Sequence, residues 1–166
     1  TTEPSYMRVI HHKTAKMFES AAETGAVLGA RTETDFSQAF ATFGRHLGVA
    51  FQLIDDVLDY QGDVNELGKN VGDDLAEGKP TLPLIYAMAN GSNDEKQLIR
   101  QAVRKGGLED LPSILDIVNR SGALEYTMER AKAEAQAALD CLKDIPESDH
   151  RDALTLLTEI AVARVS

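Results

Sequence analysis

The sequence predicts an all-α fold in one domain, and three observations support this. Apolar residues recur every three or four positions along most of the 166 residues, as on the buried face of a helix. No stretch alternates apolar and polar residues in the manner of a half-buried strand, and no repeat or low-complexity linker divides the chain. A chain of this length can bury a substantial core. We therefore expect a helical bundle over residues 1–166.

Two long helices are expected in the first part of the chain. The first runs from Pro4 to about Leu28, and the second from Phe36 to about Gln61. Thr32 or Thr34 is the expected N-cap of the second helix. The first helix carries an apolar stripe of Met7, Ile10, Thr14, Met17, Phe18, Ala21 and Ala22. The second carries a stripe of Ala39, Phe40, Phe43, Leu47, Ala50, Ile54 and Leu58, with Gly44 and Gly48 allowing a neighbouring helix to approach closely.

Shorter helices are expected after a loop. From Gly62 to Lys79 several glycines stand among acidic residues, a composition typical of a loop. A helix restarts at Pro80, and Ser92 with Glu95 forms a capping box for the next one. Three more helices are expected over residues 108–119, 123–143 and 151–164, the last with an apolar stripe of Ala153, Leu156, Leu157, Ile160, Ala161 and Val165.

Composition excludes several classes of function. The formal net charge is −10 and the pI is near 4.8, without the clustered Lys and Arg that hold a phosphate backbone, so we expect no nucleic-acid partner. No apolar run approaches the ~18 residues of a membrane span, and no signal-peptide pattern is present, so a soluble cytoplasmic protein is expected. Cys141 is the single cysteine and is interpreted as a core residue.

One acidic stretch on the second helix indicates a chemical role. Gln52, Asp55, Asp56 and Asp59 fall within an arc of roughly 100° on a helical wheel, beside an apolar stripe. Carboxylates so close repel one another, and carboxylate oxygens without His or Cys favour Mg²⁺ or Mn²⁺. Lys69 and Lys79 follow and could bind a diphosphate together with the metal. Read alone, such a cluster is a solvated helix face about as often as a metal site.

The longer string around these acids resembles a known family. F-Q-L-I-D-D-V-L-D followed by L-G-K-N-V-G-D-D-L-A-E-G-K-P-T-L-P-L closely resembles the second aspartate-rich region of the trans-isoprenyl diphosphate synthases, particularly the bacterial octaprenyl-type enzymes. The resemblance runs from about Tyr6 to the C-terminus and is densest at Lys13–Thr14 and Phe51–Leu84. Members are roughly twice as long as this chain. The resemblance therefore implies the C-terminal half of an isoprenoid-synthase helical bundle.

The resemblance also implies an activity. It implies a Mg²⁺-dependent prenyltransferase that elongates an allylic prenyl diphosphate with isopentenyl diphosphate into a long-chain all-trans polyprenyl diphosphate, a precursor of the ubiquinone side chain. The carried-over residues are Asp55, Asp56 and Asp59 for the metal, Lys13, Lys69 and Lys79 for catalysis, and Lys13, Thr14, Gln52, Lys69 and Lys79 for substrate. The ring of Phe51 has a minority interpretation as an aromatic wall near a developing carbocation.

Several family motifs have no counterpart in this sequence. The first D-D-x-x-D, the Arg pair after it, and the upstream Lys, Arg and His that bind isopentenyl diphosphate are absent. We therefore expect the chain to be inactive alone and to associate with the N-terminal half of the bundle or as a homodimer. The alternatives are a non-catalytic partner subunit or inactive fragment of such an enzyme, and an acidic bundle that binds divalent ions without further chemistry.

Overall fold

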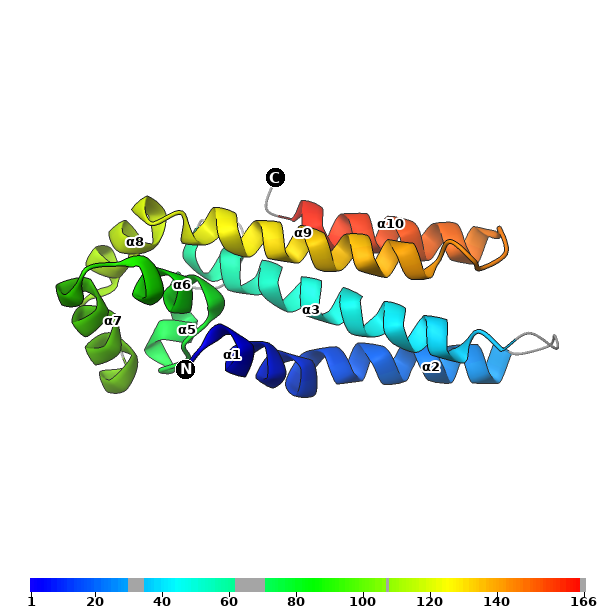
Figure 1. Ribbon diagram of the computed structural model, residues 1–166, viewed down its shortest axis with the longest axis horizontal. Coiled ribbons are helices and arrows are strands. Elements are labelled where there is room, and N and C mark those ends of the chain that lie inside the picture. The colour runs from blue at the N-terminus through cyan, green and yellow to red at the C-terminus, as the bar shows by residue number, and fades with distance from the viewer. Residues whose placement is uncertain (30–34, 62–70, 107, 165–166) are drawn as a thin grey trace. The chain divides into compact units, whose positions relative to one another are not determined.

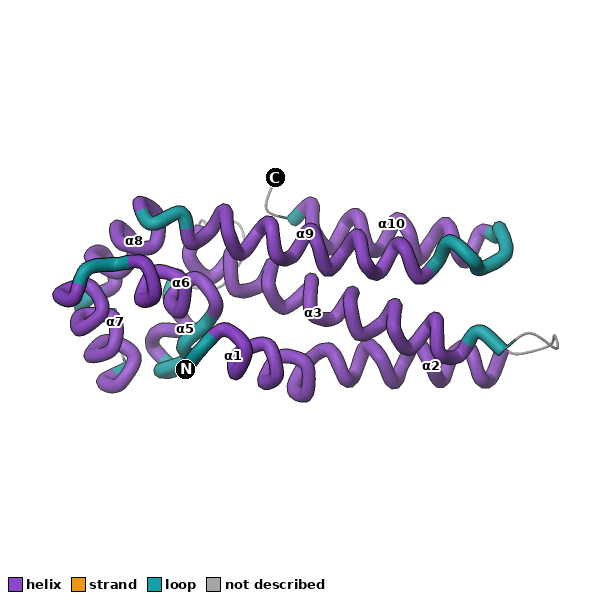
Figure 2. The backbone as a smooth tube through the Cα atoms, in the orientation of Figure 1, coloured by secondary structure: helices purple, strands orange, loops and turns teal. Residues whose placement is uncertain are grey.

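The protein is helical throughout the part that the structure describes. A computed structural model describes residues 1–29, 35–61, 71–106 and 108–164, and within those ranges it contains helices and turns but no strand (Figures 1 and 2). The predicted all-α class is therefore confirmed. The chain forms two compact units, the first made of Thr1–Tyr6 with Asp55–Glu129 and the second of Met7–Ile54 with Arg130–Ser166. Several helices contribute to both units, and assignment of residues 1–166 to one domain stays a prediction.

The first predicted helix is continuous but changes its hydrogen-bonding pattern. It consists of α1 (Glu3–Ile10), a π-helical segment η1 (His11–Ala15) and α2 (Lys16–Gly29). A π-helix bonds residue i to i+5 and so accommodates an extra residue in its turn. The buried residues Ile10 and Ala15 are accordingly five positions apart. The π segment was not predicted.

This extra residue changes which side chains of α2 are buried. Beyond the π segment, Phe18 and Ala22 pack against the core of the second unit. Met17, which the periodicity assigned to the same apolar stripe, is instead 73% exposed. Ala21 is exposed as well. The predicted stripe is therefore wrong at these two positions, because the pattern assumed an uninterrupted α-helix.

The second long helix, α3 (Ser37–Gln61), matches its predicted range closely. Asp35 Oδ1 accepts a hydrogen bond from Ser37 N at 2.8 Å and so caps the start of the helix, whereas the predicted caps Thr32 and Thr34 lie outside the described residues. A Cβ atom at Gly48 would lie 2.6 Å from Ala15 Cα, and one at Gly44 would overlap the Phe18 carbonyl. The predicted close approach at both glycines is confirmed, and the neighbour is the first long helix.

The core of the second unit lies among four helical segments. Helices α9 (Ala123–Cys141) and α10 (Asp149–Ala163) run alongside each other, as Figure 1 shows. One cluster of this buried core consists of Phe43, Leu47, Ala138, Leu142, Ile145 and Ala161. Cys141 is half-buried against this cluster and its thiol contacts the Ala137 carbonyl at 3.2 Å, as a packed residue would.

The apolar stripe predicted for α10 is largely exposed. Leu156, Leu157 and Ile160 have exposed fractions of 56%, 50% and 52%. The face that packs inward instead presents Leu154, Thr158 and Ala161. The Thr158 hydroxyl can be buried there because it donates to the Leu154 carbonyl at 2.9 Å.

Four short helices belong to the first unit. They are α5 (Asp73–Ala76), α6 (Leu82–Asn90), α7 (Asn93–Lys105) and α8 (Leu111–Arg120). The predicted capping box is present, since Ser92 N donates to Glu95 Oε2 at 2.5 Å and Glu95 N donates to Ser92 Oγ at 3.3 Å. The prediction of a loop from Gly62 to Lys79 is wrong at α5, where one helical turn forms. Residues 62–70 lie outside the described part of the chain.

None of the helices in the described ranges combines the length and the apolar character needed to cross a membrane.

Candidate functional site

The three predicted acids lie on α3 in unequal surroundings. Asp55 and Asp59 are four residues apart and are half-buried, whereas Asp56 is 0% exposed. Residues four apart share one face of a helix, and adjacent residues differ by about 100°. Asp55 and Asp59 therefore share a face, and Asp56 is turned away from it into the protein.

Asp59 is held by the start of α5. Gly72 adopts a left-handed conformation (φ +86°) and its N–H donates to the Asp59 carbonyl at 2.9 Å, which brings the chain back alongside α3. The next turn places Asp74 N at 3.3 Å and 3.4 Å from the two carboxylate oxygens of Asp59. Burial, followed by the negative charge of Asp74, raises the pKa of Asp59 to about 6. Asp73 and Asp55 raise it further, so negative charge is crowded at this point.

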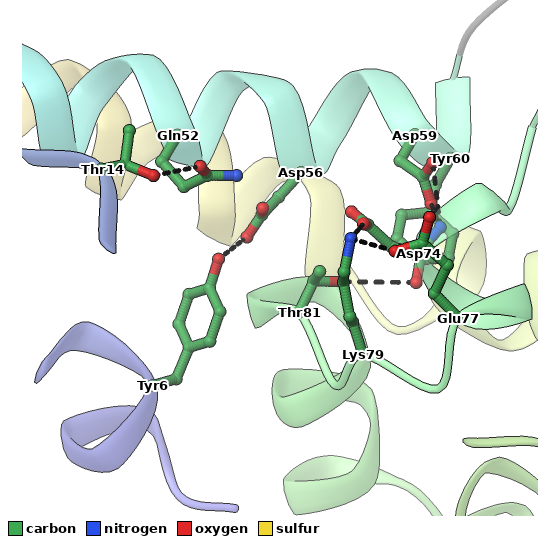
Figure 3. Close-up of polar contacts among 10 residues, drawn as sticks. All are labelled: Tyr6, Thr14, Gln52, Asp56, Asp59, Tyr60, Asp74, Glu77, Lys79 and Thr81. Atoms are coloured by element: carbon green, nitrogen blue, oxygen red, sulfur yellow. Dashed lines mark hydrogen bonds and ion pairs between the residues drawn. The ribbon is translucent and has the colours of Figure 1, made fainter. Parts of the chain in front are cut away.

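Lys79 lies beside the same acids. Its ammonium is 3.3 Å from Asp74 Oδ1 and forms a closer ion pair with Glu77 (Figure 3). The Lys79 side chain is 44% exposed. Hydrogen bonds to Glu77 and Asp74 raise the pKa of Lys79. Exposed ion pairs of this kind contribute only ~0–1 kcal/mol. An anion can therefore compete with Asp74 and Glu77 for this cation.

Asp56 is enclosed by polar partners from two other elements of the first unit. The Tyr6 hydroxyl, on α1, donates to Asp56 Oδ2 (Figure 3). Leu82 N, at the start of α6, donates to the same oxygen at 3.3 Å. Burial and then the negative charge of Asp56 raise the pKa of Tyr6. Sequence reasoning missed Tyr6. The available signal was a tyrosine among apolar residues of a helix, because a buried tyrosine hydroxyl needs a partner.

A second missed contact lies next to this group. The Tyr60 hydroxyl is 3.3 Å from Thr81 Oγ1, and both residues are buried. Burial raises the pKa of Tyr60. Thr81 is the N-cap residue of α6, so this contact fixes the helix start that presents Leu82 N to Asp56.

The remaining described candidates, Lys13, Thr14 and Gln52, lie in the second unit. Thr14 Oγ1 donates to Gln52 Oε1 at 2.9 Å, so the structure brings these two side chains together across 38 residues of sequence (Figure 3). Lys13 is exposed and lies with Thr14 inside the π segment. π turns occur frequently at functional sites. Lys69 lies outside the described residues.

Magnesium was implied by the sequence, and the donor set fits that ion. Within the described ranges no three His, Cys, Asp or Glu side chains converge as a complete metal site. Mg²⁺ does not require three protein ligands, because it typically uses one or two carboxylates with water and substrate phosphates. The crowded carboxylates of Asp55, Asp59 and Asp74 provide such oxygens, and the raised pKa of Asp59 reflects negative charge that a cation would neutralise.

The Phe51 ring already has a cation against it. The Arg164 guanidinium lies 4.5 Å from the ring centroid, and the Phe18 ring packs against Phe51 at 5.5 Å between centroids. All three residues belong to the second unit. The ring face thus attracts positive charge, but in this structure the cation is part of the protein.

One described cavity of the first unit does not involve the predicted residues. It has a volume of about 650 Å³, and its walls include the stacked rings of Tyr86 and Tyr126 and the side chains of Arg100 and Arg104. No predicted site residue lines it. The acidic face is therefore the better candidate, because it combines the predicted residues with crowded charge.

Comparison with known proteins relates the chain to one family. A family model described as polyprenyl synthetase matches residues 1–118. The octaprenyl diphosphate synthase of Haemophilus influenzae is 48% identical over 165 residues, which cover 99% of this chain and 50% of that protein. The chain thus spans about half the length of the curated relatives it matches.

Solved structures agree with this relationship. A decaprenyl diphosphate synthase from Rhodobacter capsulatus has a TM-score of 0.89 and 38% identity, covering 100% of this chain and 51% of that one. A polyprenyl synthase from Caulobacter crescentus, complexed with calcium and isoprenyl diphosphate, has a TM-score of 0.90 and 38% identity, covering 99% of this chain and 51% of that one. The all-α arrangement is therefore that of the isoprenyl synthases.

Proposed function

The chain belongs to the polyprenyl synthetase family, and from that premise we propose that it forms the diphosphate-binding half of a trans-prenyltransferase. The proposed reaction elongates an allylic prenyl diphosphate with isopentenyl diphosphate to a long-chain product of the octaprenyl type. The observation that carries the proposal is the crowding of Asp55, Asp59 and Asp74, where burial and like charge raise the pKa of Asp59 to about 6. A divalent cation bound at such a site would neutralise the crowded negative charge and could bind an anionic ligand in turn.

In the proposed reaction the allylic carbon–oxygen bond breaks and its electron pair leaves with the diphosphate. The double bond of isopentenyl diphosphate then forms the new carbon–carbon bond, and a proton passes to the released diphosphate. Mg²⁺, when bound, neutralises charge on the leaving group, which is a large contribution to rate in reactions of this kind. We propose Asp55 and Asp59 as its protein ligands.

The lysines have a distinct proposed role. Lys13, Lys69 and Lys79 bind the departing diphosphate as compact positive charges, and Thr14 and Gln52 orient it by hydrogen bonding. Lys79 would exchange its exposed pairs with Asp74 and Glu77 for the diphosphate. The Thr14–Gln52 hydrogen bond supports the pairing of these two residues, since it holds both side chains in a fixed arrangement.

Binding and turnover should be tested separately. Isothermal titration of the 166-residue chain with farnesyl diphosphate should give binding that requires Mg²⁺ and weakens at least tenfold in Lys13→Ala. For turnover, this chain can replace the matching half of the Haemophilus influenzae relative in a chimera. Elongation by the chimera should fall by orders of magnitude in Asp55→Ala. Diphosphate binding that does not depend on Mg²⁺ would contradict the proposal. Near-normal turnover of the Asp55→Ala chimera at limiting Mg²⁺ would contradict it as well.

A second candidate is a non-catalytic subunit whose acidic face completes the cavity of another chain. The observation in its favour is that the chain spans about half of its relatives. The chimera discriminates between the two. A subunit that had lost catalytic competence would bind the diphosphate and still yield an inactive chimera.

A further inference from the structure

We propose that Asp56 is an internal anchor of the acidic face rather than a metal ligand, and that Tyr6 is the positioning residue that holds it. The purpose of the anchor, which is to support Mg²⁺ binding by Asp55 and Asp59, rests on the proposed function. The anchor itself is read from contacts within the first unit.

Those contacts occupy a carboxylate oxygen in dry surroundings. Tyr6 is 7% exposed and Asp56 is 0% exposed. Asp56 Oδ2 accepts a hydrogen bond from the Tyr6 hydroxyl (Figure 3) and another from Leu82 N at 3.3 Å. A buried carboxylate is costly unless donors compensate it, and the N-terminus of a helix such as α6 favours negative charge. Mg²⁺ keeps several waters and dehydrates reluctantly, so an enclosed carboxylate suits it poorly.

The three contacting groups come from three elements of the first unit. Tyr6 lies on α1, Asp56 on α3 and Leu82 at the start of α6, and 50 residues separate Tyr6 from Asp56 in sequence. Because Asp56 is rotated about 100° from Asp55, fixing the inward residue fixes the rotation of α3 about its axis. The anchor therefore sets the direction in which Asp55 and Asp59 leave the helix.

The first test compares conservative variants at the two adjacent acids. In Asp56→Asn the amide oxygen can still accept from Tyr6 and Leu82 N, so Mg²⁺ affinity measured by titration of the chain should change less than about threefold. In Asp55→Asn it should fall at least tenfold, as expected when a charged ligand is lost. Equal weakening in the two variants would overturn the proposal, because it would make Asp56 a ligand.

The second test removes only the Tyr6 hydroxyl. Tyr6→Phe should weaken Mg²⁺ binding severalfold although Tyr6 touches no metal. The matched control is Tyr126→Phe, in the same unit, which loses a similar tyrosine–carboxylate bond, to Glu3 at 2.8 Å. The control should leave Mg²⁺ affinity unchanged. If both variants lower the Mg²⁺ affinity equally, the effect is a general loss of stability, and Tyr6 is not a positioning residue.

The third test needs no metal, so it also separates failure of the anchor from failure of the proposed function. In urea denaturation without Mg²⁺, Tyr6→Phe should lower the folding equilibrium constant at least about tenfold. In the Asp56→Asn background, where the bond is no longer charge-assisted, the same change should lower it only about threefold. Equal losses in both backgrounds would refute the Tyr6–Asp56 bond, whatever the chain does with Mg²⁺.

Discussion

Replacing Asp59 by Asn should stabilise the metal-free protein at neutral pH. The pKa of Asp59 rises from 3.8 to about 6, chiefly through burial and then through Asp74, so the ionised side chain is disfavoured in the folded state. Two pKa units correspond to about 3 kcal/mol, and because Asp59 is only half-buried, solvent screening reduces this by roughly half, to about 1.5 kcal/mol. The neutral amide of the Asp59→Asn variant would remove this cost, and its oxygen can still accept from Asp74 N.

The sign of the pH dependence follows from the raised pKa. Folded Asp59 binds its proton more tightly than unfolded Asp59, so the wild-type protein gains stability from this group as pH falls from about 7 to about 4. Asn does not titrate. The advantage of Asp59→Asn should therefore be about 1.5 kcal/mol at pH 7.5 and should vanish near pH 4.

Thermal unfolding followed by circular dichroism in EDTA measures this effect. For a chain of this length, 1 kcal/mol corresponds to roughly 2–4 °C, so the variant should melt about 3–6 °C higher at pH 7.5. The matched control is Asp144→Asn, at an exposed acid, which should melt like the wild type at both pH values. Identical melting of Asp59→Asn and wild type at pH 7.5, or an advantage that persists at pH 4, would refute the reasoning.

Three further predictions concern packing, capping and association. Gly44→Ala should destabilise the chain by about 1–3 kcal/mol in urea denaturation, because the new Cβ would overlap the Phe18 carbonyl. Gly25→Ala, where a Cβ would meet nothing within 4 Å, should stabilise the chain by ~0.5–1 kcal/mol. The opposite order of stabilities would contradict the close helix contact at Gly44. Ser92→Ala should cost about 1 kcal/mol through loss of the capping box, and an unchanged midpoint would show that the cap contributes nothing. Ultracentrifugation should detect self-association that Leu157→Lys weakens, because the exposed apolar side chains of α10 favour a partner; a monomer at all concentrations would contradict this.

The sequence predicted those features that depend on residues close together in the chain. The range of α3 follows from periodicity, and the capping box at Ser92 is complete within four residues. The crowding of acids on α3 was likewise visible from spacing. Such features need no knowledge of the rest of the molecule, because local geometry determines them.

Features that depend on distant residues were not predictable in the same way. The enclosure of Asp56 requires Tyr6, and the fixed orientation of Gln52 requires Thr14, 38 residues away. On a helical wheel Asp56 is equivalent to its acidic neighbours, since a wheel shows direction but not what lies there. The exposure of Leu156 and Leu157 likewise depends on which face of α10 meets the core.

The π segment compensates for one extra residue in the first long helix. Deleting a single residue between His11 and Ala15 would allow an ordinary α-helix through this point, with every hydrogen bond of the helix still made. Phe18 would then follow Ile10 by seven positions, nearly two α-helical turns, so Phe18 and Ala22 would keep their buried side. If the same residues were all kept and wound as an α-helix, α2 would instead rotate by about 100° about its axis, and Met17 would turn toward the core in place of Phe18. A shortening at this point should therefore be tolerated, whereas loss of the π turn at full length should not.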